Sequence, residues 1–184
     1  MAVVANKGMT LEEFLNLEDP PDGSQLELFN GEVITLPPPK SIHGIVCNRV
    51  GRVLGNFVDE KKLGWVTSND SGVIIEGDRD SMRGVDVGFW SIAANPKKPP
   101  DYFDNPPDLA VEVLSPNYRR KMIRDKVKQY IQAGVPIVWL VDPESEVVTV
   151  FKGGMQGVEF EGDDILDGGE VLPGFSCKTH DLFD

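Results

Sequence analysis

The segment from Asp108 to Asp142 constrains the fold most strongly, because it indicates a strand, a helix and a second strand in direct succession. The two outer runs, LAVEVL and PIVWLV, are almost entirely apolar, which is typical of strands covered on both faces. The run between them carries helix signals, with Ser115 as the expected N-cap, Pro116 in the first turn and Gly134 as the C-cap. Such a succession predicts a right-handed crossover between parallel strands.

The rest of the chain predicts helices and strands that can surround this unit. Asn30-Gly31 lies between two alternating runs and is typical of a hairpin turn, because both residues tolerate positive φ. The segment from Ser91 to Pro107 indicates a long surface loop, a candidate rim for a site. The acidic, Gly-rich C-terminus indicates short strands or loops at a sheet edge. The other expected elements are a short helix opened by a Thr10–Glu13 capping box, a hairpin over 26–36, a long amphipathic helix over 42–62, and strands over 65–76, 82–90 and 147–153, with a polar turn at 77–81.

These elements predict a mixed α/β fold (α+β) in which helices flank a central mixed β-sheet. With 184 residues the chain fits a single domain spanning 1–184, whose core we place at about 26–152. No apolar run is long enough to span a bilayer, and the N-terminus lacks the apolar core of a secretory signal, so we expect a soluble cytoplasmic protein with no membrane partner. Cys47 and Cys177 indicate neither a disulfide nor a thiolate metal site and are interpreted as inert thiols.

Charge is distributed unevenly along the chain. Thirty acidic against eighteen basic residues give a net charge of −12, which disfavours general affinity for nucleic acid. One segment is basic, however, and it could contact phosphates locally. Its basic residues are Arg119, Arg120, Lys121, Arg124, Lys126 and Lys128.

Two acidic residues stand inside otherwise apolar strands. Glu112 interrupts LAVEVL, and Asp86 interrupts RGVDVGF. A buried carboxylate without a partner costs several kcal/mol, so each needs a cation or strong donors. Together they would form an oxygen-ligand site suited to Mg²⁺ or Mn²⁺. In the alternative interpretation, Asp86 caps a strand end and Glu112 forms a salt bridge with an arginine such as Arg83 or Arg119.

Lys126 falls on the apolar face of the predicted helix. At about 100° per residue it lies between Met122 and Tyr130, on the side that must pack against the sheet. An inward lysine can neutralise a strand carboxylate or stabilise charge on a phosphate. The alternative is a stem that follows the apolar face while the ammonium stays in solvent. The same count turns Arg119 inward near the helix start and turns four residues toward solvent: Lys121, Arg124, Asp125 and Lys128.

The order of these features resembles a known family. The run PPDLAVEVLSPNYRRKMIRDKVKQYIQAGVPIVWLVDPE, preceded by LELFNGEVITLPPPKSIHG and RGVDVGFW and followed by LPGF, is similar to the Uma-two (Uma2) family of putative restriction endonucleases, within the PD-(D/E)XK nuclease superfamily. The match spans about Leu26 to Phe175. It implies a restriction-endonuclease-like core with an N-terminal hairpin.

The resemblance joins three residues into one catalytic centre. It implies that Asp86 and Glu112 hold the metal and that Lys126 assists catalysis. The proline that usually precedes the aspartate is Val85 here, and the lysine usually found two residues after the glutamate is Leu114. The family itself moves this lysine to the helix, where Lys126 stands.

Further residues are candidates around this centre. Glu27 is preferred over Glu32 as an additional metal ligand, at the family's ExxxGE-like pattern. His43 is either a hydrogen-bonded core histidine or a group beside the site. Tyr130 is expected in the core with its hydroxyl near the site. The supporting candidates are His43, Tyr130, Ser115 and Arg119.

The residues and the resemblance together predict a Mg²⁺- or Mn²⁺-dependent endonuclease that hydrolyses phosphodiester bonds of DNA. The resemblance alone suggests a homodimer. Two alternatives stay open. One is a catalytically inactive binding or assembly module that keeps the nuclease fold, which the net charge of −12 favours. The other is a hydrolase of a smaller phosphate ester.

Overall fold

The computed structural model describes residues 8–75, 81–103, 105–115 and 120–184. Its helices and strands follow the predicted order, and the acidic C-terminus adds short strands, as expected. The elements are α1 (Leu11–Leu15), β1 (Gln25–Phe29), β2 (Glu32–Leu36), α2 (Ser41–Lys61), β3 (Gly64–Ile75), β4 (Ser81–Ser91), β5 (Leu109–Val113), α3 (Arg120–Gln132), β6 (Ile137–Asp142), β7 (Val147–Lys152), β8 (Gly157–Glu161), β9 (Ile165–Gly168), β10 (Leu172–Lys178) and the 3-10 turn η1 (Thr179–Leu182).

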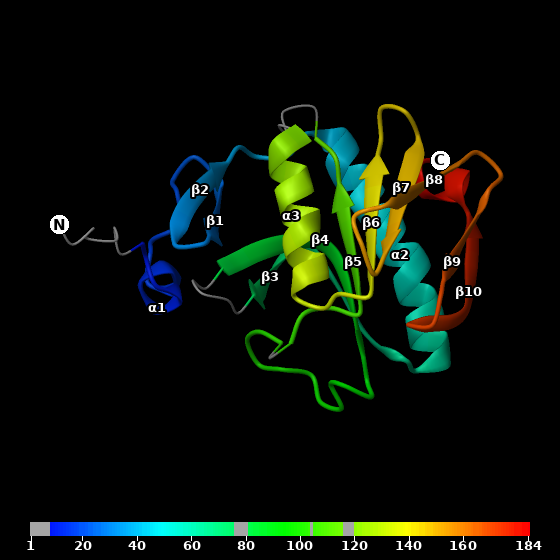
Figure 1. Ribbon diagram of the computed structural model, residues 1–184, viewed down its shortest axis with the longest axis horizontal. Coiled ribbons are helices and arrows are strands. Elements are labelled where there is room, and N and C mark those ends of the chain that lie inside the picture. Colours follow the sequence, from blue (N-terminus) through cyan, green and yellow to red (C-terminus); the bar gives the residue numbers. More distant parts are fainter. Residues whose placement is uncertain (1–7, 76–80, 104, 116–119) are drawn as a thin grey trace.

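A mixed eight-stranded sheet forms the centre of the fold. Its strand order is β2-β1-β4-β5-β6-β7-β8, and β3 also pairs with β4. Strands β5 and β6 are parallel, as the crossover predicts, while the other described pairings are antiparallel. Figure 1 shows α3 in front of the sheet and α2 behind it, with the β9–β10 hairpin near the last strands. The predicted mixed α/β fold is confirmed.

The local signals in the sequence explain where these elements begin and end. Thr10 and Glu13 form the reciprocal capping box at the start of α1. Asn30 and Gly31, with φ of 50° and 80°, make the tight turn of the β1–β2 hairpin. Gly134 has φ of 88° and donates to the Ile131 carbonyl after α3, which satisfies a carbonyl at the end of the helix. The predicted turn at 77–81 and the start of α3 after Ser115 fall largely outside the described residues.

The two faces of the sheet carry separate apolar cores. Leu109, Val111 and Val113 of β5 pack with the apolar stripe of α2. Ala110 packs with residues of α3 on the opposite face. Because side chains alternate along a strand, Glu112 points to the same face as Ala110, toward α3.

Strand β4 pairs with β3 along one edge and with both β1 and β5 along the other. Strand β3 pairs with β4 along almost its whole length, from Gly64–Ser91 to Ile75–Ser81. The other edge pairs with β1 at Met82 and with β5 only over 87–89. A gap in the ladder therefore lies along residues 83–86, between β1 and β5.

A β-bulge lies opposite this gap. The β3–β4 register shifts between Ser68 and Ser71, so that Asn69 and Asp70 on β3 stand against Asp86 on β4. Both residues of the bulge have positive φ, 66° and 53°. The bulge changes which side chains of β4 face which core: Val85 packs on the α3 side and Val87 on the α2 side.

The described residues of the long loop after β4 do not line the pocket beside this gap, which corrects the expectation that the loop forms a rim of the site. It folds over the strand ends, where its Asn95 and Asn105 carbonyls accept from the indoles of Trp65 and Trp90. Its proline-rich part lines a separate groove with Leu11 and Ile74. Among the described residues, no helix combines the length and the apolar character needed to cross a membrane.

Replacing Gly134 by alanine should lower the free energy of unfolding by about 1 kcal/mol, because a Cβ disfavours positive φ. Gly55 offers a matched control inside α2, where an added Cβ meets open space. Gly55→Ala should instead raise stability by about 0.5–1 kcal/mol, since alanine loses less backbone entropy in a helix. Urea denaturation of both variants measures the two effects, and changes of equal sign would contradict this account of the helix end.

Candidate metal centre

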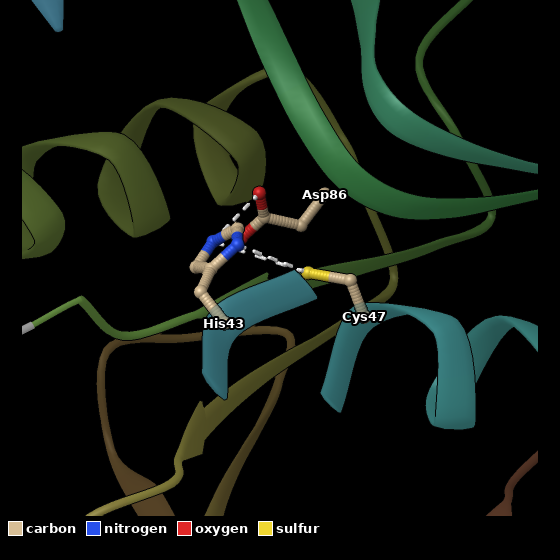
Figure 2. A group of neighbouring side chains, drawn as sticks. All are labelled: His43, Cys47 and Asp86. Atoms are coloured by element: carbon tan, nitrogen blue, oxygen red, sulfur yellow. Dashed lines mark hydrogen bonds and ion pairs between the residues drawn. The ribbon is translucent and has the colours of Figure 1, made fainter. Parts of the chain in front are cut away.

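Asp86 lies at the gap in the β4 ladder, where it contacts both β5 and α2. Its Oδ2 accepts from the Val113 amide at 2.6 Å, and its Oδ1 lies 3.3 Å from His43 Nε2. The Cys47 sulfur lies 3.4 Å from the other ring nitrogen of His43. Figure 2 shows His43, on α2, beside the carboxylate, with the Cys47 sulfur, one turn further along, directed at the imidazole. Asp86 is thus held by a main-chain donor on one side and by an imidazole on the other.

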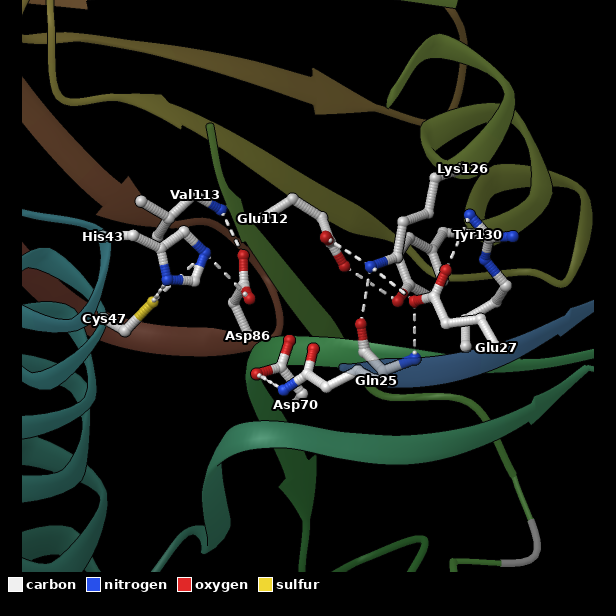
Figure 3. Close-up of polar contacts among 12 residues, drawn as sticks. Gln25, Glu27, His43, Cys47, Asp70, Asp86, Glu112, Val113, Lys126 and Tyr130 are labelled. Carbon is white, nitrogen blue, oxygen red and sulfur yellow. Dashed lines mark hydrogen bonds and ion pairs between the residues drawn. The ribbon is translucent and has the colours of Figure 1, made fainter. Parts of the chain in front are cut away.

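Glu112 lies on β5, next to Asp86. The β4–β5 ladder ends where Val87 faces Val111, and Asp86 and Glu112 are the next residues on the two strands. Lys126 Nζ lies 2.6 Å from Glu112 Oε2, and the Tyr130 hydroxyl donates to Oε1 at 2.9 Å. Figure 3 shows these α3 side chains reaching the strand carboxylate. The inward orientation expected for Lys126 is confirmed, since its exposed fraction is 1%.

Glu27 of β1 completes the environment of the lysine. Its Oε1 lies 3.1 Å from Lys126 Nζ and accepts from the Gly84 amide at 2.9 Å. Its Oε2 lies 3.2 Å from Arg83 Nη2. The ammonium also donates to the Gly84 carbonyl at 2.6 Å. Both backbone groups of Gly84 are therefore used by side chains in the ladder gap, and Arg83 pairs with Glu27 rather than with Glu112.

Asp70 is a member of the cluster that the sequence interpretation missed. It stands in the β3 bulge opposite Asp86, and Gln25 of β1 donates to its Oδ2 at 2.7 Å. A signal was present, because Asn69-Asp70 interrupts a strand with two residues that tolerate positive φ. The pattern could not show that the bulge faces Asp86, since strand pairing decides that.

The buried carboxylates differ in how readily they hold a proton. Burial raises the pKa of Glu112 to about 8, although Lys126 opposes the shift. Burial and the charge of Asp86 raise the pKa of Asp70. Burial also acts to raise the pKa of Asp86, but the hydrogen bond from His43 and the charge of Lys126 outweigh it, so its pKa is lowered. Burial lowers the pKa of His43, but its contact with Asp86 outweighs burial and the net shift is upward.

The side chains of the cluster carry an excess of negative charge. Four carboxylates gather here, those of Glu27, Asp70, Asp86 and Glu112, against the two permanent cations Arg83 and Lys126. Four negative against two positive charges leave an excess of two when all are ionised. Carboxylate oxygens are the ligands that Mg²⁺ and Mn²⁺ prefer. The raised pKa values of Glu112 and Asp70 act against the same excess of negative charge that a bound ion would neutralise.

An open pocket of about 420 Å³ gives access to this cluster. Asp70 and His43, which both interact with Asp86, lie in its wall. The apolar side of the pocket comes from β2 and the following prolines, and Ser115 and Met122 border it near the start of α3. A ligand in the pocket would therefore contact His43 and Asp70, the two neighbours of Asp86.

Some of the other candidate residues are buried in the cluster, and others are exposed. Glu27 is buried in the cluster, as preferred, whereas Glu32 is exposed on β2. The predicted role of Glu27 as a metal ligand stays a prediction, because its described contacts are to Lys126, Arg83 and the Gly84 amide. Arg119 lies outside the described residues. Of the basic segment, three side chains are exposed on α3: Lys121, Arg124 and Lys128.

The raised pKa of Glu112 predicts how stability depends on pH in the presence of a chelator. The pKa of a glutamate in an unfolded chain is about 4.3. Between that pH and pH about 8, native Glu112 holds a proton that the unfolded chain releases. This contribution to stability is fully present below that window and is lost as the pH rises through it. Glu112→Gln cannot titrate. Urea denaturation from pH 5 to pH 9 should therefore show wild type losing stability relative to Glu112→Gln, and parallel profiles would contradict the assignment.

Known proteins share both the sequence pattern and the fold of this chain. The profile of the Uma2 family, described as a putative restriction endonuclease, matches residues 11–180. No functionally curated protein matches the sequence. The crystal structure of a putative nuclease from Anabaena variabilis superposes with a TM-score of 0.79 at 20% identity, over 95% of this chain and 97% of that one. At this identity the likeness establishes the fold alone. The family match spans most of the sequence, and the chain therefore belongs to the Uma2 family of putative restriction endonucleases.

Proposed function

We propose that the protein is a Mg²⁺- or Mn²⁺-dependent endonuclease that hydrolyses phosphodiester bonds of DNA. One observation carries the proposal: two buried carboxylates, Asp86 and Glu112, follow the last β4–β5 pair on neighbouring strands, and Lys126 of the crossover helix lies 2.6 Å from the second of them. The membership of the chain in a family of putative restriction endonucleases supports the reaction class.

Asp86 and Glu112 would hold the metal ion. Such an ion, when bound, lowers the pKa of a coordinated water and offsets charge on the phosphate. His43 and the Val113 amide fix the orientation of Asp86, and the Tyr130 hydroxyl fixes that of Glu112. Hydrogen bonds from neighbouring groups that fix the ligand are typical of carboxylates that bind metals.

Lys126 supplies the positive charge closest to these carboxylates. Its ammonium is held by Glu27 and the Gly84 carbonyl, so it is already oriented before substrate arrives. A preorganised cation can stabilise the charge that grows on the phosphoryl oxygens as water adds to phosphorus and a P–O ester bond breaks. Glu27 would act here by positioning Lys126.

The surroundings of the pocket offer a route for DNA despite the acidic total. Lys121, Arg124 and Lys128 are exposed on α3, and Met122 of the same helix borders the pocket. Local positive potential acts within about 8–10 Å at physiological salt, so the net charge of the whole chain does not decide binding at this face.

Glu112→Ala should reduce metal-dependent nicking of supercoiled DNA by at least about 100-fold, because one metal-binding carboxylate is lost. Asp86→Asn should have a similar effect. Glu60→Gln provides a control, since Glu60 is exposed and pairs only with its neighbour Lys61 among the described contacts. Undiminished nicking by purified Glu112→Ala would refute the proposed centre.

The rival reading is a catalytically inactive binding or assembly module, which the net charge of −12 favours. The metal requirement separates the two. An ion that binds only the native state at a hundred times its Kd stabilises the fold by about 2.7 kcal/mol. Millimolar Mn²⁺ or Mg²⁺ should therefore raise the melting temperature of wild type but not of Asp86→Asn. An unchanged wild-type melting temperature would favour the rival.

A further inference from the structure

His43, Cys47 and Asp86 form a second group of potential metal ligands beside the carboxylate cluster. One donor atom from each lies within 4.8 Å of the other two, and all three side chains are buried. This is the one such group found among the described residues. It differs from the Asp86–Glu112 pair in chemistry, because it adds an imidazole and a sulfur to a single carboxylate.

One of the separations between these atoms matches the coordination shell of a small tetrahedral ion. Zinc–ligand bonds of about 2.0 Å to nitrogen or oxygen and 2.3 Å to sulfur place N and O about 3.3 Å apart, and S and N about 3.5 Å apart. His43 Nε2 lies 3.3 Å from Asp86 Oδ1 and 3.9 Å from Cys47 Sγ. The sulfur lies closer to Nδ1, at 3.4 Å, so the imidazole ring must turn before Nε2 and Sγ can bind one ion.

Helix geometry and a main-chain hydrogen bond position the three donors. His43 and Cys47 are four residues apart on α2, so they project from the same face of one helix. Asp86 is fixed independently by the Val113 amide. His43 also lines the open pocket, which gives an ion a path in and leaves room for a water as the fourth ligand.

We propose that His43 Nε2, Cys47 Sγ and Asp86 Oδ1 form a binding site for Zn²⁺, open to a water on the pocket side. Imidazole and thiolate ligands favour Zn²⁺ over Mg²⁺, which takes oxygen ligands. Binding converts the Cys47 thiol to a thiolate and releases its proton to solvent, and the metal–sulfur bond replaces the S–H bond. The proposal gives Cys47 a role other than that of the inert thiol expected from the sequence.

Sharing of Asp86 gives the site a regulatory consequence, which rests on the proposed function. An Asp86 oxygen committed to Zn²⁺ on the α2 side is drawn away from an ion shared with Glu112. Zinc should therefore oppose Mg²⁺-dependent cleavage through competition for one carboxylate. The binding itself does not depend on any nuclease activity.

Cobalt titration of the metal-free, reduced full-length protein tests the site directly. Co²⁺ takes the same ligands as zinc and gives a thiolate charge-transfer band in the near ultraviolet. The band should appear with one equivalent, persist in Cys177→Ser and vanish in Cys47→Ser, with Co²⁺ affinity lowered at least about tenfold. Cys177 is the matched control, because it is the other cysteine of the chain. Equimolar Zn²⁺ should bleach the band.

Two results would overturn the zinc site. One is a folded wild-type protein that gives no thiolate band, and the other is a band that survives Cys47→Ser. If Cys47→Ser does not fold, protection of the Cys47 thiol from alkylation by Zn²⁺ in wild type and its loss in His43→Gln decide the question. Nicking assays with Mg²⁺ are run separately, so a cobalt band without nicking supports the zinc site and counts against the nuclease.

Discussion

The buried ammonium of Lys126 is the interaction on which the arrangement of the site depends. It contacts Glu112 on β5, Glu27 on β1 and the Gly84 carbonyl on β4, so one charge joins three strands to α3. Loss of one partner from a buried ion pair costs about 3–5 kcal/mol, because the remaining charge cannot reach water. The cluster is therefore costly to assemble and costly to take apart. Replacing it with apolar residues would give a simpler core, so its presence favours function over stability as its explanation.

Asp86 lies between two different sets of side chains. Toward α3 lie oxygen ligands and a fixed cation, and toward α2 lie an imidazole and a thiol. The β-bulge opposite Asp86 makes this possible, because it changes the facing of β4 between Val85 and Val87. In a regular strand the side chain of an acidic residue points to one face of the sheet only. The bulge lets a single carboxylate be reached from both.

The sequence alone predicted much of the fold and the nearest members of the site. The crossover unit, the hairpin at Asn30-Gly31 and the inward face of Lys126 follow from periodicity and turn chemistry, which act over a few residues. Glu112 was conspicuous as an acid inside an apolar strand, but only a resemblance joined it to Asp86. The role of Asp70 was missed because the register of β3 on β4 decides it. The pairing of Glu27 with Arg83 was missed for the same reason, since it depends on which strand borders which edge.

Gly84 has a consequence for how the sheet keeps its shape. Its amide donates to Glu27 and its carbonyl accepts from Lys126, at the edge of β4 that β1 and β5 share. A strand can extend only onto free main-chain groups, and here both are already bound by side chains. Neither β1 nor β5 can therefore extend its pairing with β4 across Gly84. The hydrogen bonds that orient Lys126 thus also keep β1 and β5 apart along residues 83–86 of β4. The same atoms maintain the gap in the sheet and the arrangement of the charged groups inside it.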